Sequence, residues 1–159
     1  MLQPVAHAIL QAREELLTIM QGFPEHLLWQ KPAGMASPGF HLQHLSGVLD
    51  RLFTYARNQQ LSAEQVQQLH DESLSPNANF DLRKLLQRFH KQVEEALLQL
   101  RQIDQTSLTE QRFIGRKKVP TTVMGLLFHA AEHTMRHIGQ LMVTVKVLKA
   151  TPTEGSEYG

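Results

Sequence analysis

The chain has 159 residues, of which 42% are hydrophobic and 19% charged, which suits one globular domain and excludes a disordered or collagen-like chain. Sixteen basic and fifteen acidic residues leave a formal charge of +1, so no overall field favours binding to nucleic acid or to an anionic membrane. The absence of cysteine excludes disulfides, thiolate metal ligands and a cysteine nucleophile.

Two predicted helices fill the N-terminal part of the chain. Apolar residues recur every three or four positions over about residues 3–21, which is the spacing of an amphipathic helix, and Gly22 and Pro24 end it. The second helix covers about residues 37–58. Ser37 is its expected N-cap, because a serine hydroxyl can accept a hydrogen bond from a free backbone N–H of the first turn.

One short helix and two long helices are predicted in the rest of the chain. Residues 62–71 begin with SAEQ, in which Ser62 and Gln65 fit a capping box, so we predict a short helix there. The third long helix covers about residues 80–103 and carries a continuous apolar face. The fourth covers about residues 121–149, and one of its first two residues, both threonine, is the expected N-cap.

The segments between these helices show no strand pattern. The loop before the fourth helix, which ends at about residue 119, carries the basic run GRKK at 115–118, whose charges we expect to be solvated. None of the amphipathic helices can bury its apolar stripe alone, so we predict an all-α fold, a four-helix bundle with an additional short helix. Residues 1–150 are expected to form a single domain and the polar stretch 151–159 a flexible tail.

The sequence contains no targeting signal that we recognise. No segment is long and apolar enough to span a bilayer, and MLQPVAHAILQAREELL lacks the basic start and unbroken apolar run of a signal peptide. We therefore expect a cytoplasmic protein with no contact to a membrane.

Three histidines, His129, His133 and His137, lie four residues apart in FHAAEHTMRHIGQL of the fourth helix. Residues at this spacing share one helix face at a rise of about 6 Å, so two such imidazoles can bind one ion through bonds of about 2.1 Å. His129 and His137 are about 12 Å apart along the axis, so one ion takes His133 and only one of them. A third ligand must come from elsewhere, and FHLQHL in the second helix offers His41 or His44. Three imidazoles that leave positions open would form a catalytic type of site.

The stretch HAAEH in the fourth helix also matches H-x-x-E-H, the inverted zinc-peptidase pattern in which Glu132 would be the general base. That pattern needs a further acidic ligand downstream, and the later acidic residues are Glu154 and Glu157, both in the polar tail. Glu132 can instead pair with Arg136 one turn later, so we interpret the match as coincidental. No glutamate is followed by histidine three residues later, which excludes the di-iron carboxylate pattern.

The remaining histidines have no partners at ligand spacing, and we expect no metal binding from His7, His26, His70 and His90. Trp29 and Tyr55 are single aromatic residues that we interpret as part of the core.

Two segments, SPGFHLQHLSGVLDRLFTYARNQQLS and TTVMGLLFHAAEHTMRHIGQL, resemble the DinB-like (DinB/YfiT-like) superfamily of small metal-binding four-helix proteins. The similarity extends over nearly the whole chain in the length and order of the helices. Its specific part is a histidine early in the second helix together with His-x-x-x-His before Gly-Gln on the last. The resemblance implies His44, His133 and His137 as metal ligands, followed by Gly139 and Gln140.

The resemblance leaves His41 and His129 as additional histidines, either alternative ligands or neighbours that orient a ligand by a hydrogen bond. It also implies one divalent ion, zinc, nickel or manganese, in an open pocket at one end of the bundle, and a homodimer.

Characterised members of that superfamily include thiol-dependent S-transferases and a thiol-dependent isomerase. The resemblance therefore implies a metal-dependent enzyme of S-transferase or hydrolase type that activates water or a low-molecular-weight thiol and acts on a small molecule. The candidate catalytic residues are Gln140, Glu132, Arg136 and His41. The alternative is a non-catalytic module for metal binding, dimeric interaction or stress response. Nucleic acid is not an expected partner under either hypothesis.

Overall fold

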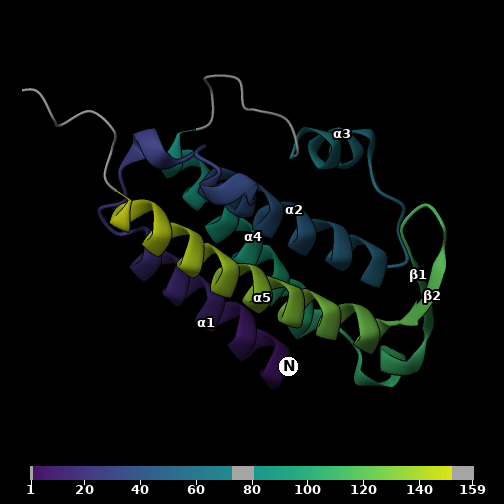
Figure 1. Cartoon of the computed structure of the whole chain (residues 1–159). Coiled ribbons are helices and arrows are strands. Elements are labelled where there is room, and N and C mark those ends of the chain that lie inside the picture. Colours follow the sequence, from purple (N-terminus) through teal and green to yellow (C-terminus); the bar gives the residue numbers. More distant parts are fainter. Residues whose placement is uncertain (1, 73–80, 152–159) are drawn as a thin grey trace, which may run out of the picture.

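Four long helices pack side by side in the computed structural model, which describes residues 2–72 and 81–151 (Figure 1). The described α-helices are α1 (Gln3–Met20), α2 (Pro38–Ala56), α3 (Ala63–Asp71), α4 (Leu82–Gln102) and α5 (Val123–Ala150). Short 3-10 turns lie at η1 (Glu25–Leu27), η2 (Pro32–Gly34) and η3 (Gln105–Thr109). The predicted helical bundle with an additional short helix, here α3, is confirmed. Most of the predicted tail lies outside the described residues.

The helix starts depend on the polar side chains that precede them. Ser37 Oγ accepts a hydrogen bond from the backbone N–H three residues later, at 3.2 Å, which confirms the predicted cap of α2. Ser62 and Gln65 form both hydrogen bonds of a capping box at the start of α3. Of the two threonines before α5, Thr122 is the one whose hydroxyl caps the helix.

One hydrophobic core lies between the long helices. α2 packs against both α4 and α5, and α1 packs against α5. The largest fully buried side chains are Phe89, Ile9, Leu16, Leu28, Leu42, Leu45, Leu49, Leu85, Leu100, Leu126, Leu127 and Ile138. Trp29 and Tyr55 are partly buried against this core, which confirms their interpretation as core residues. Among the described residues, none of the helices is both long and apolar enough to cross a membrane.

The prediction of a strand-free connection between the third and fourth long helices was wrong. β1 (Gln111–Ile114) and β2 (Val119–Thr122) form an antiparallel hairpin. Residues 115–118, the basic run GRKK, make its turn, where Gly115 adopts the left-handed backbone conformation that glycine tolerates, with a φ of 70°. Strands of four residues are too short for a period-two pattern to stand out, and Pro120 further weakens the strand signal.

The hairpin also contacts the end of α2. Arg112 Nε donates a hydrogen bond to the backbone oxygen of Ala56, the last residue of α2, at 2.9 Å. The last carbonyls of a helix have no partner within the helix, so Arg112 satisfies one of them. Since β2 leads directly into α5, the hairpin ties the end of α2 to the start of α5 (Figure 1).

Candidate metal centre

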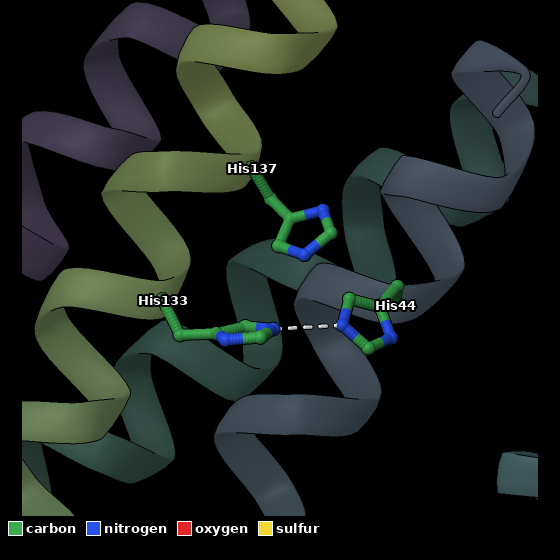
Figure 2. Close-up of side chains that lie close together, drawn as sticks. All are labelled: His44, His133 and His137. Atoms are coloured by element: carbon green, nitrogen blue, oxygen red, sulfur yellow. Dashed lines mark hydrogen bonds between the residues drawn. The ribbon is translucent and has the colours of Figure 1, made fainter. Parts of the chain in front are cut away.

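Three of the predicted site residues, His44, His133 and His137, point toward one another in the space between α2 and α5 (Figure 2). One ring nitrogen of each lies within 4.8 Å of one nitrogen of each of the others. His44 Nε2 and His133 Nε2 are 2.9 Å apart, and the ring of His137 lies 4.5 Å from that of His44 and 4.6 Å from that of His133. We call these three residues the histidine triad.

The helices place the triad at the boundary of the core. His133 and His137 are one turn apart on α5, so their rings lie on the same face of that helix. His44 comes directly before Leu45 and His137 directly before Ile138, and both apolar side chains are completely buried. The packing of α2 on α5 therefore carries the imidazoles to one place, where each remains half-buried.

A buried carboxylate orients the ring of His44. Glu72 Oε2 lies 2.8 Å from His44 Nδ1, and Arg51 binds both oxygens of this carboxylate at 2.6 and 3.3 Å. An ionised carboxylate only accepts hydrogen bonds, so His44 Nδ1 carries the proton. In the neutral form of this ring, the lone pair of His44 Nε2 is directed at His133, and that form binds a metal.

Glu72 and Arg51 were not among the predicted site residues. Glu72 lies 28 residues from His44, and no helical spacing links two residues so far apart in the sequence. The available signal is in α2 itself, where His44, Gly47 and Arg51 interrupt an otherwise apolar face at steps of three and four residues. A polar stripe of this kind on a buried helix indicates a polar partner elsewhere in the chain.

His41, on α2, contacts His137 on α5. Its Nδ1 lies 3.0 Å from Nδ1 of His137, so one of these two nitrogens donates a hydrogen bond to the other. Burial, with a smaller contribution from nearby His44, lowers the pKa of His41 to about 4. A neutral His41 can accept a hydrogen bond from His137 Nδ1–H, which leaves His137 Nε2 as the nitrogen available to a ligand. His41 thus lies where a ligand-orienting neighbour was expected.

The other two rings of the site are also neutral near pH 7. Burial, with a smaller contribution from the neighbouring His44, lowers the pKa of His133 to about 4 and that of His137 to about 3. Metal ions bind the neutral imidazole, so these rings need not lose a proton first.

The donor set fits one divalent ion. Two nitrogens that bind one ion at about 2.1 Å lie about 3.0–3.4 Å apart, depending on the angle, so a slight opening of the 2.9 Å contact admits the ion. His133 Nδ1 is buried and has no hydrogen-bond partner among the described residues. Within the described residues, the hydrogen-bond contact of the His133 ring is therefore made by Nε2, with His44.

A second group, His129, Glu132 and His133, also has its ligand atoms within 4.8 Å of one another. All three residues lie on α5, and the group shares His133 with the triad. The carboxylate of Glu132 is bound by Arg136, with a 2.6 Å contact to Oε2, which confirms the predicted pair and lowers the pKa of Glu132. Glu154 and Glu157 lie outside the described residues.

The remaining candidates lie on the surface. Arg136 and Gln140 are exposed side chains of α5, and they lie one residue before and three residues after His137. The histidines for which no metal binding was expected are exposed and belong to neither group of ligand atoms found in the described part of the chain: His7, His26, His70 and His90.

Comparison with known proteins agrees with this architecture. A family model described as the DinB superfamily matches residues 8–141. A crystal structure of a protein from Streptococcus pneumoniae, determined in structural genomics work, is similar to the chain with a TM-score of 0.66. The match covers 91% of this chain and 88% of that one at 14% sequence identity, a level at which the likeness shows the fold alone. The comparison with curated proteins found no match.

Proposed function

The chain belongs to the DinB superfamily, and from this premise we propose that it is a metal-dependent enzyme that holds one divalent ion on His44, His133 and His137. One observation carries the proposal: three imidazoles from two helices converge with their ligand nitrogens within 4.8 Å of one another. A buried polar cluster of this kind is expensive to maintain unless its members have partners.

The ion would supply Lewis acidity, which produces a nucleophile from water or a thiol at neutral pH. The chain contributes three imidazoles: Nδ1 of His44 contacts the carboxylate of Glu72, and Nδ1 of His137 contacts His41. Because the sequence has no cysteine, a reacting thiol must arrive as a low-molecular-weight cosubstrate. The reaction proposed is therefore an S-transfer or a hydrolysis on a small molecule.

Substrate contacts are proposed for the exposed residues next to the triad. Arg136 and Gln140 lie near His137 on α5 and are open to solvent, and Gln140 is the better candidate because Arg136 is already paired with Glu132. Glu132 is less suited to act as a base, because Arg136 already binds its carboxylate and keeps its pKa low.

A homodimer is part of the proposal. α5 leaves large apolar side chains on its outer surface, with Phe128 66% and Val143 58% exposed. Apolar groups on an outer helix face support an interface with another protein surface.

Metal analysis of the purified protein tests the proposal. The wild type should contain about one divalent ion per chain, His137→Ala should lose it, and His129→Ala should retain it. Loss in His129→Ala with retention in His137→Ala would assign the ion to the second group of ligands. If the wild type stays metal-free after supplementation, the proposal is wrong. Metal binding without product from thiol and electrophile would favour the non-catalytic alternative.

A further inference from the structure

Glu72 is the residue that follows α3, and its side chain reaches α2. Only 6% of the residue is exposed, and its carboxylate contacts two side chains of α2. Oε2 lies 2.8 Å from His44 Nδ1, while Oε1 accepts a hydrogen bond from Arg51 Nη1 at 2.6 Å. The short helix α3 is thus linked to the histidine triad through a single buried group.

The pairing with Arg51 does not by itself explain this arrangement. Arg51 is 7% exposed, so the pair removes two charges from water. The cost of desolvation can exceed the attraction between two buried charges, and apolar residues of similar size often stabilise a fold equally well. A stabilising role alone therefore gives little reason to bury a carboxylate beside His44.

Gly47 shows that α2 makes room for this carboxylate. A Cβ atom at position 47 would lie 2.1 Å from Glu72 Oε1 and 2.5 Å from Arg51 Nη1, closer than real Cβ contacts allow. A glycine in the middle of a helix costs about 1 kcal/mol relative to alanine. Gly47 occurs in α2 at the position where the carboxylate of Glu72 contacts the helix.

We infer that Glu72 is a positioning residue for the histidine triad, an inference that rests on the proposed metal site. The carboxylate accepts a hydrogen bond from His44 Nδ1–H, fixes that tautomer and directs Nε2 toward His133. Arg51 neutralises the buried negative charge, and Gly47 leaves the space that the carboxylate occupies. Hydrogen-bonding partners of this kind orient a ligand ring and increase its basicity.

Metal titration tests the inference in the folded protein. We expect Glu72→Gln and Gly47→Ala to weaken Zn²⁺ binding by about 10–100-fold, measured by competition with a chelator, since both disturb the same hydrogen bond. Gly139→Ala is the matched control, because a Cβ there has no neighbour within 4 Å. Circular dichroism establishes that each variant is folded.

A second measurement does not require metal. In long-range ¹H–¹⁵N spectra of the metal-free wild type, His44 should be the Nδ1–H tautomer. In the double variant Arg51→Met/Glu72→Leu, which removes both charges together, the Nε2–H tautomer should increase. A wild type that binds no Zn²⁺ would contradict the proposed function, while the spectra would still decide the role of Glu72. An unchanged tautomer, with Zn²⁺ affinity unchanged in Glu72→Gln, would overturn the inference.

Discussion

His44 Nε2 and His133 Nε2 lie 2.9 Å apart, although 89 positions separate the two residues in the chain. Glu72 keeps the proton of His44 on Nδ1, so Nε2 presents a bare lone pair to His133. Two lone pairs cannot face each other at this distance without a cation or a proton between them. When both rings are neutral, the proton between them is carried by His133 Nε2, and an ion that binds to the triad replaces it.

His133→Ala should abolish metal binding whichever group of ligands is used. This residue is common to the triad and to the second group, so its loss leaves two ligands at most in either. We expect the affinity for Zn²⁺ to fall by more than about 100-fold, measured by calorimetry. His90→Ala, on the exposed surface of α4, is the control and should bind as the wild type does. Full occupancy in His133→Ala would exclude both groups.

Arg51→Met should destabilise the protein far more than Arg51→Met/Glu72→Leu. The single variant leaves the carboxylate of Glu72 buried without its guanidinium partner, which costs about 3–5 kcal/mol of unfolding free energy. The double variant removes both charges and should recover most of that loss. Urea denaturation of the wild type and the two variants measures the difference. Equal stability of the single and double variants would show that the pair is not buried in solution.

The metal-free protein should lose stability as the pH falls from about 6.5 to about 4. Over this range the unfolded chain binds protons that the folded protein excludes, since burial lowers the pKa of His41 to about 4 and that of His137 to about 3. The stability that the neutral rings of His41 and His137 contribute is complete above the pKa of histidine in the unfolded chain. It is lost as the pH falls toward the lower pKa of the folded protein. Urea midpoints in the presence of a chelator should fall less steeply with pH in His41→Gln than in the wild type. If the urea midpoints of His41→Gln and the wild type fall equally steeply with pH, the lowered pKa of His41 is contradicted.

Added metal should raise the thermal stability of the wild type. An ion that binds only the folded protein stabilises it by about 2.7 kcal/mol at a concentration one hundred times its Kd. Removal of the ion by a chelator should reverse the rise in Tm. The same addition should leave the Tm of His44→Ala unchanged, because that variant lacks the ligand from α2. A matching rise in His44→Ala would indicate binding elsewhere.

Local sequence patterns carried most of the fold prediction. Apolar residues every three or four positions define the long helices, and short-range hydrogen bonds to Ser37 and Ser62 mark the starts of α2 and of the short helix α3. The hairpin was missed because each strand has four residues and its pairing joins segments that carry little signal separately. The apolar pattern of a helix repeats within one segment of the sequence, whereas a β-hairpin forms only when two separate segments pair.

The candidate site was predictable to the extent that it lies on one helix. The spacing of His133 and His137 on α5 follows from the helical repeat, but spacing alone could not choose between His129 and His137. The resemblance to a family supplied that choice, and the assignment of the ligands stays a prediction. Glu72 was missed because its contact with His44 depends on how α3 packs on α2, which no local pattern encodes.

The β-hairpin bears on the triad without touching it. Arg112 of the hairpin donates a hydrogen bond to the last carbonyl of α2, the helix that carries His44. The hairpin then continues into α5, the helix that carries His133 and His137. The distance between those two helices, which sets the space available to an ion, is thus held at one end by a hydrogen bond to α2 and by the continuous chain into α5.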